Sequence, residues 1–160
     1  MALSEEEVAP YSKELERLQE NSLYSAQAYF EAAKFSEAVG RLFVFLPALV
    51  SAIAGAIIAT GGSKAWGVAS AVSGAVAATA SYLGSERKSA SYKNSARRYT
   101  SLRHRLTFES SILGNNETIT EAEQATRSLT AEYQEIVAAD DPVPNFLYEK
   151  ARKRINESIV

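Results

Sequence analysis

The chain has 160 residues, a formal net charge of -2 and no cysteine. This length allows one domain or a small membrane module, and the charge balance gives no indication of a nucleic-acid-binding protein. The lack of cysteine excludes disulfides and thiolate metal sites. The N-terminal stretch MALSEEEVAPYSKELERLQE is acidic and lacks an apolar run, so it does not resemble a secretory signal peptide.

Residues 1–41 are predicted to form an N-terminal cytoplasmic helix that leads towards the first apolar segment. Apolar side chains recur there at roughly helical spacing, which indicates one buried face. The predicted core positions are Leu15, Leu18, Ala26, Tyr29, Ala33 and Phe35.

Two apolar segments follow, at 42–60 and 65–83, and each is 19 residues long. A helix needs about 20 apolar residues to cross the hydrocarbon core of a bilayer. Gly61 and Gly62 in the connection TGGSK suit a helix end and a tight turn. The sequence therefore predicts an all-α membrane protein, with a two-transmembrane helical hairpin at 42–83 that continues into a cytoplasmic helical bundle.

The soluble alternative is a bundle that buries both apolar segments. The second segment favours this alternative, because 13 of its 19 residues are Gly, Ala, Ser or Thr. Such a composition lowers the free energy gained when the segment moves from water into lipid. Two uncharged helices of this length would nevertheless leave a large exposed apolar patch in water. The flanks also carry side chains typical of a membrane interface. These are Arg41, Trp66, Tyr82, Arg87 and Lys88.

The distribution of positive charge predicts the orientation of the hairpin. The turn carries only Lys64, whereas Lys and Arg residues flank the other ends of both segments. The positive-inside rule then places both termini in the cytoplasm and the protein in the bacterial inner membrane.

Small residues in the second segment predict close helix packing. Small-xxx-small series allow backbones to approach in lipid, and one of them contains Gly74. A neighbouring face consists of Ser70, Ser73, Ala77 and Ser81. Two interpretations remain open for these positions. They pack against the first helix and neighbouring subunits, or their hydroxyls line a water-filled path.

Region 84–160 is predicted to be helical and cytoplasmic. Its first helix is expected to continue directly from the second apolar segment and to end at Gly114-Asn115-Asn116. A capping box formed by Thr120 and Glu123 would start the next helix, and the prolines of DDPVPN would separate it from a last helix at 145–157. The predicted core positions are Tyr92, Ala96, Tyr99, Leu102, Leu106, Ala122, Ala125, Leu129, Tyr133, Ile136, Phe146, Leu147, Ala151 and Ile155.

Four arginines follow the second apolar segment on one predicted helix: Arg97, Arg98, Arg103 and Arg105. At 1.5 Å per residue they would lie roughly 20–33 Å beyond Leu83, too far for lipid headgroups to be their partners. They either pair with glutamates of neighbouring helices or bind an anionic ligand, such as a nucleotide or oligonucleotide, or an acidic protein.

Sequence features of an enzyme are missing. His104 is the single histidine and is expected to be a solvated surface residue. Without a second histidine or a cysteine, a nitrogen- or sulfur-ligated metal site is implausible. No nucleophile elbow or phosphate-binding loop occurs. We expect a protein that is not an enzyme and has neither metal nor cofactor.

The chain resembles the SLATT domain family of two-transmembrane effectors in bacterial anti-phage systems. The resemblance covers the stretch YSAQAYFEAAKF, the hairpin, SYKNSARRYTSLRHRL and the closing DDPVPNFLYEKARKRI. It implies a membrane pore that depolarises an infected cell, and control by a nucleotide-type signal from a neighbouring nucleotidyltransferase. No catalytic residues are implied.

The predicted function is thus an oligomeric, pore-forming inner-membrane effector, with four or more identical subunits. The alternative is a membrane-anchored helical adaptor whose hairpin forms no pore. A transporter is disfavoured, because the spans carry no charged side chain and no interrupted helix.

Overall fold

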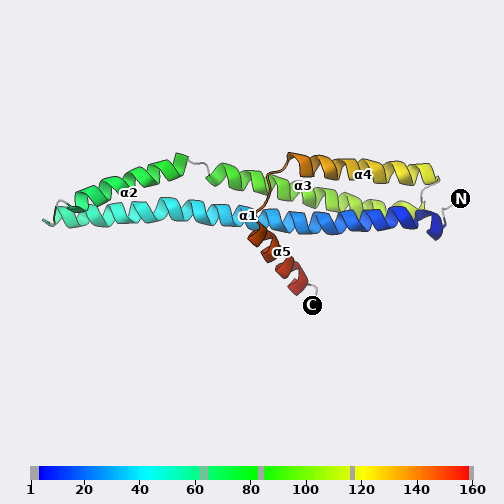
Figure 1. Ribbon diagram of the computed structural model, residues 1–160, viewed down its shortest axis with the longest axis horizontal. Helices are drawn as coiled ribbons and strands as arrows, with labels where there is room; N and C mark the ends of the chain where they lie inside the picture. The colour runs from blue at the N-terminus through cyan, green and yellow to red at the C-terminus, as the bar shows by residue number, and fades with distance from the viewer. Residues whose placement is uncertain (1–3, 62, 64, 83–84, 116–117, 159–160) are drawn as a thin grey trace. The chain divides into compact units, whose positions relative to one another are not determined.

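The computed structural model describes residues 4–61, 63, 65–82, 85–115 and 118–158, and every regular element in these ranges is a helix (Figure 1). The all-α class predicted from the sequence is confirmed for these residues. The helices are α1 (Glu5–Ala59), α2 (Ala65–Tyr82), α3 (Ser85–Ile112), α4 (Ile119–Ala139) and α5 (Asn145–Ser158), with a 3₁₀ turn η1 (Leu113–Asn115) after α3.

The helices divide into two compact units. The first unit comprises Met1–Ala32 and Tyr92–Val160, and the second comprises Ala33–Ser91. Helices α1 and α3 each contribute to both units, because each runs across a boundary between them.

The first unit is a helical bundle in which the N-terminal part of α1 lies beside α3 and α4 (Figure 1). Leu15 and Leu18 of α1 and Leu102 and Leu106 of α3 are its largest fully buried apolar side chains. The predicted stripe on α3 is confirmed, since all five of its positions are buried. Most of the predicted stripes on α1, α4 and α5 are buried as well: Leu15, Leu18, Ala26, Tyr29, Ala33, Ala122, Leu129, Ile136, Leu147, Ala151 and Ile155.

Two predicted core positions are wrong, because Phe35 and Phe146 are exposed. Phe35 is two residues from buried Ala33, which turns it by about 200° around the helix. On α5 the buried face contains Leu147, Ala151 and Ile155 at a spacing of four, which leaves Phe146 outside it. Ala125 and Tyr133 of α4 are only partly buried.

Helix α4 begins with a capping box two residues earlier than predicted. The amide of Glu121 donates to the Thr118 hydroxyl at 3.3 Å, and the Thr118 amide donates to the Glu121 carboxylate at 3.3 Å. The pattern Thr-x-x-Glu occurs twice in this stretch, and the prediction chose the second copy. Glu123 instead forms an ion pair with Arg127, at 2.6 Å.

The segment between α4 and α5 is attached to the bundle by tyrosine and serine side chains. The Tyr29 hydroxyl donates to the carbonyl oxygen of Asp141 at 2.8 Å, and the Ser95 hydroxyl donates to the Asp140 carboxylate at 2.7 Å. Burial raises the pKa of Tyr29 to about 12, and the nearby Asp140 carboxylate acts in the same direction. The predicted break at DDPVPN is confirmed, since α4 ends at Ala139 and α5 begins at Asn145.

The second unit is built on the C-terminal part of α1 and on α2, which runs back alongside it (Figure 1). Gly61 closes α1 with a φ of 90°, a conformation that favours glycine, and its amide donates to the Ile58 carbonyl oxygen at 3.0 Å. Gly62 and Lys64 lie outside the described residues. The turn predicted after the first apolar segment is therefore confirmed at Gly61.

The predicted continuation of the helix from the second apolar segment into the following region stays a prediction, because it depends on residues outside the described part. Helix α2 ends at Tyr82 and α3 begins at Ser85. Leu83 and Gly84 lie outside the described residues.

Candidate functional site

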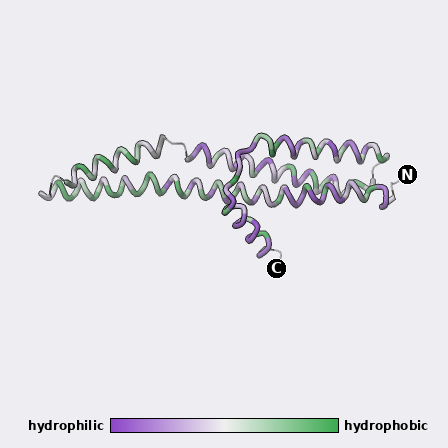
Figure 2. The backbone as a smooth tube through the Cα atoms, viewed as in Figure 1, coloured by the Kyte–Doolittle hydropathy of each residue, from purple (hydrophilic) through white to green (hydrophobic). Residues whose placement is uncertain are grey.

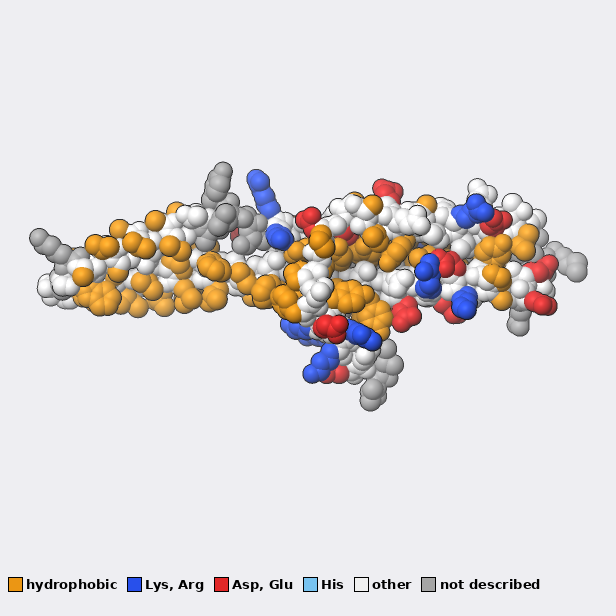
Figure 3. Space-filling view, in the orientation of Figure 1, with side chains coloured by type: hydrophobic (Ala, Val, Ile, Leu, Met, Phe, Trp, Pro, Cys, Tyr) orange, Lys and Arg blue, Asp and Glu red, His pale blue; other side chains and the backbone are white. Residues whose placement is uncertain are grey.

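The two arms of the hairpin, 42–60 and 65–82, carry no charged side chain, and their outer surface is apolar. Figure 2 shows hydrophobic residues along both arms of the hairpin, and Figure 3 shows their side chains on its surface. Ala54 is the one residue of the described apolar segments that is buried, whereas Phe45 is 65% exposed and Val68 is 66% exposed. The other exposed large apolar side chains here are Leu42, Phe43, Val44, Leu46, Leu49, Val50, Ile53, Ile58, Trp66, Val72 and Val76.

One helix among the described residues is long and apolar enough to cross a membrane. It is α1, whose most apolar window has a mean hydropathy of 2.5 and is 6% buried. The apolar helix Ala65–Thr79 of α2 is shorter than that limit. A second span at 65–83 therefore stays a prediction, and its last residue lies outside the described part.

The two arms of the hairpin meet through small side chains. The Ser51 and Ser70 hydroxyl oxygens are 3.0 Å apart, and the Ser51 hydroxyl also lies 3.4 Å from the Ser70 carbonyl oxygen. A Cβ atom built on Gly67 would lie 3.6 Å from Cδ1 of Ile58. These contacts join the arms in antiparallel order, with residue 51 opposite 70 and residue 58 opposite 67.

The predicted serine face of α2 turns towards α1. Ser70, Ser73 and Ala77 are half-buried, whereas most of the residues around them on α2 are exposed. The side chain of Ser81 lies outside the described residues. Within one chain the Ser70 hydroxyl is used for helix packing, which matches the packing interpretation of this face.

Gly74 differs from Gly67, because a Cβ atom at Gly74 would meet nothing within 4 Å. It lies on an exposed stripe of small residues, together with Ala71, Ala75 and Ala78. This stripe is available to a surface outside the chain.

The predicted interface residues lie at the ends of the hairpin. Arg41 is exposed on α1 and is 3.9 Å from the Glu37 carboxylate. Trp66 is partly exposed at the start of α2, and Arg87 and Lys88 are exposed on the first turn of α3. Tyr82 is the last residue of α2, and its side chain lies outside the described residues.

The four predicted arginines of α3 do not form one binding surface. Arg98 and Arg105 are seven residues apart and share a side of the helix, but Arg103 is rotated by about 140° from Arg98. The guanidinium of Arg105 forms an ion pair with Glu132 of α4. Arg97 and Arg103 are exposed. Sequence proximity therefore overstated their spatial proximity.

A cavity of about 530 Å³ next to Arg98 has the wrong charge for an anionic ligand. Glu132 and Glu135 of α4 line it together with Ser101 and Ser128. Two carboxylates against one guanidinium disfavour a phosphate group. For Arg105 the arrangement matches the alternative in which arginines pair with glutamates of a neighbouring helix.

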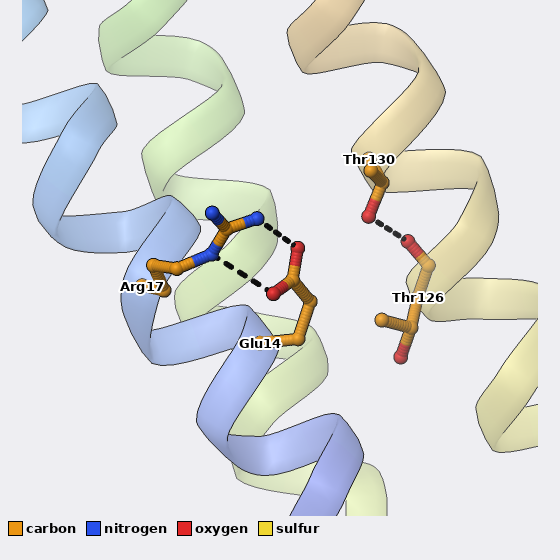
Figure 4. Close-up of polar contacts among 4 residues, drawn as sticks. All are labelled: Glu14, Arg17, Thr126 and Thr130. Carbon is orange, nitrogen blue, oxygen red and sulfur yellow. Dashed lines mark hydrogen bonds and ion pairs between the residues drawn. The ribbon is translucent and has the colours of Figure 1, made fainter.

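A second groove, of about 410 Å³, lies between residues 10–14 of α1 and residues 123–134 of α4. Figure 4 shows local contacts of three residues that line it, Glu14, Thr126 and Thr130. Arg17 donates to both carboxylate oxygens of Glu14, at 2.9 and 2.6 Å, and the Thr130 hydroxyl donates to the Thr126 carbonyl oxygen at 2.9 Å. These partners within single helices make the groove a poor ligand site.

Sequence reasoning missed Glu31, which is 1% exposed on α1. Its carboxylate forms ion pairs with Lys150, at 2.9 Å, and with Arg154 of α5. The available signal was a lone glutamate in the apolar stretch AYFEAAKF, together with two cations four residues apart on the last helix.

His104 is exposed, as predicted. The described residues contain no group of three or more His, Cys, Asp or Glu side chains that could hold a metal ion. The absence of enzymatic activity stays a prediction.

No protein family, curated protein or solved structure matches the chain. The resemblance to the SLATT family therefore remains a prediction from the sequence.

The two glycines of α2 offer a matched test of hairpin packing. Because the chain has no cysteine, a Ser51→Cys/Ser70→Cys pair reports the contact between the arms by oxidant-induced disulfide formation. We expect Gly67→Leu to slow this reaction at least about fivefold, since the leucine extends beyond a Cβ that already contacts Ile58 of α1, and overpacking costs about 1–3 kcal/mol. Gly74→Leu should leave the rate unchanged. Equal slowing by both substitutions would contradict the assigned orientation of α2.

Proposed function

We propose that the protein is a bacterial inner-membrane effector whose hairpin, 42–60 and 65–83, lies in lipid and assembles into an oligomer that permeabilises the membrane. One observation carries this proposal: the large apolar side chains of the hairpin are exposed almost without exception.

The energetic argument concerns what surrounds these side chains. Burying a large apolar side chain is worth about 1.5–3 kcal/mol, and more than ten such side chains are exposed on the hairpin unit. Soluble monomers rarely expose a contiguous patch of this kind. Lipid covers all of it at once, and both arms are helices, in which backbone hydrogen bonds are satisfied internally.

The small residues on the exposed side of α2 favour assembly into an oligomer. Its exposed small stripe, Ala71, Gly74, Ala75 and Ala78, gains little from lipid but allows another helix to approach closely. A homo-oligomer of four or more subunits uses this stripe between copies and leaves the larger side chains of α1 to the lipid.

A second candidate function is a membrane-anchored helical adaptor. It is favoured by the Ser51–Ser70 contact, which consumes hydroxyls that a water-filled path would otherwise use. Because these hydroxyls are used within one chain, a pore would be lined by surfaces that form between neighbouring subunits. Control by a nucleotide-type signal, which the family resemblance implies, is not supported by the acidic cavity at Arg98.

A pair of arginine substitutions separates lipid from water around the hairpin. Ile53 of α1 is 50% exposed and Val137 of α4 is 48% exposed, so both substitutions would be mild in a soluble protein. In a membrane span, Ile53→Arg costs about 2.5–3.5 kcal/mol of insertion free energy.

We expect Ile53→Arg to lose carbonate-resistant membrane association, and Val137→Arg to keep it. Vesicles reconstituted with the parent chain should release trapped dye faster than protein-free vesicles, and Ile53→Arg should abolish the excess. Membrane association without any dye release would favour the adaptor. Equal behaviour of both arginine variants would contradict insertion.

The proposed orientation places the turn at residues 61–64 in the periplasm and both termini in the cytoplasm. A single cysteine at exposed Ser63 should react with an impermeant thiol reagent in intact spheroplasts. A single cysteine at Ser128, which is exposed on α4, should react only after lysis. The reverse labelling pattern would contradict the orientation.

A further inference from the structure

Glu31 is the one charged side chain that is fully buried among the described residues. A carboxylate is stable in such a place only when charged or polar partners replace the water that it has lost. The identity of those partners therefore decides which elements must stay docked on α1.

Helix α5 supplies the opposite charge. Nζ of Lys150 lies 2.9 Å from one carboxylate oxygen of Glu31, and the guanidinium of Arg154 binds the other. The two cations are four residues apart, so they lie on one side of α5 and reach the carboxylate together. The Gln27 amide, at 3.4 Å, adds a weaker contact from α1 itself.

The remaining attachment of α5 is small. Its buried side chains are Leu147, Ala151 and Ile155, and it follows a non-helical segment that contains two prolines. A 14-residue helix with three buried apolar side chains, and a long hydrogen bond of 3.5 Å from the Tyr24 hydroxyl to Asn156, is the kind of element that detaches locally while the rest of a domain stays folded. The ion pairs with Glu31 are therefore central to its docking.

The position of Glu31 on α1 links α5 to the hairpin unit along the chain. Glu31 lies two residues before Ala33, where the second unit begins, and α1 is one uninterrupted helix from Glu5 to Ala59. If α5 leaves, the carboxylate loses both cations and has to become hydrated. Release of α5 therefore leaves a hydrated carboxylate, without its two cations from α5, on α1 two residues before the hairpin unit.

We propose that α5 is a releasable latch. While Lys150 and Arg154 neutralise Glu31, α1 is held in its present form and the hairpin assembly is closed. Release of α5 exposes Glu31, and membrane permeability rises. The effect on permeability rests on the proposed function, whereas the dependence of α5 docking on Glu31 does not.

The docking is tested by hydrogen exchange of the full chain in vesicles. In Lys150→Gln/Arg154→Gln the buried carboxylate loses both of its cations from α5, and we expect the α5 amides to exchange about a hundredfold faster. The matched control is Arg152→Gln/Lys153→Gln, which removes the same charge from α5 but does not touch Glu31. Its α5 amides should exchange at the parental rate.

Adding Glu31→Gln to Lys150→Gln/Arg154→Gln gives the sharpest test, because it also removes the buried negative charge. The triple variant should recover most of the parental protection of α5. Two results would overturn the proposal that the buried charge of Glu31 keeps α5 docked. One is that the α5 amides of the triple variant exchange as fast as those of the double variant. The other is that the α5 amides of the control, Arg152→Gln/Lys153→Gln, also exchange faster than in the parent.

Dye release tests the coupling to permeability. The double variant should release dye several-fold faster than the parent, and the control and triple variants should behave like the parent. If α5 is released while dye release stays at a measurable parental rate, the coupling is overturned. If neither the parent nor the double variant releases dye, the proposed pore function is wrong, and the exchange comparison still decides whether Glu31 holds α5.

Discussion

The apolar side chains of the hairpin require an apolar surrounding that a single chain does not provide. Between Leu42 and Val76 the second unit buries one alanine and leaves its phenylalanines, leucines, isoleucines and valines largely exposed. The contacts between α1 and α2 at Ser51, Ser70 and Gly67 involve small residues, and the larger side chains of both arms stay exposed. The proposed insertion in lipid and the proposed assembly through α2 both follow from this unmet requirement.

The first unit follows a different principle. Its core is a set of leucines, alanines and tyrosines from α1, α3, α4 and α5, and its surface carries most of the charge (Figure 3). Stacked Tyr29 and Tyr99, with ring centroids 5.6 Å apart, join α1 to α3. Against this apolar background Glu31 stands out, because the stability of its environment depends on two cations from the last helix. Because Glu31 is buried in this otherwise apolar core, the loss of its cations from α5 can loosen α5 while the rest of the unit stays folded.

Periodicity in the sequence predicted the bundle well where apolar residues repeat every three or four positions. The stripe on α3 from Tyr92 to Leu106 is buried throughout. Prediction failed where neighbouring candidates compete, as with Phe146 beside Leu147, or Thr120 beside Thr118. In both cases the local sequence is compatible with two neighbouring residues in the same role, and tertiary packing determines which residue takes it.

The candidate site was harder to predict, because it depends on contacts between distant residues. Glu31 meets cations that are more than a hundred positions away, and no local pattern links them. Arg97, Arg98, Arg103 and Arg105 show the opposite error, because they are close in sequence but point in different directions around α3. Likewise, the hydroxyls of the serine face could have faced water or α1, and only the partner Ser51 distinguishes these cases.

Trp66, the only tryptophan, tests the central claim most directly because it reports on the surroundings of the hairpin without any substitution. It lies at the start of α2 and is partly exposed. The measurement is quenching of its fluorescence in vesicles by brominated lipids and by aqueous iodide. A hairpin in lipid predicts strong quenching by bromines near the headgroup, weaker quenching by bromines at the bilayer centre, and limited quenching by iodide. Strong quenching by iodide with none from any brominated lipid would contradict a membrane-embedded hairpin.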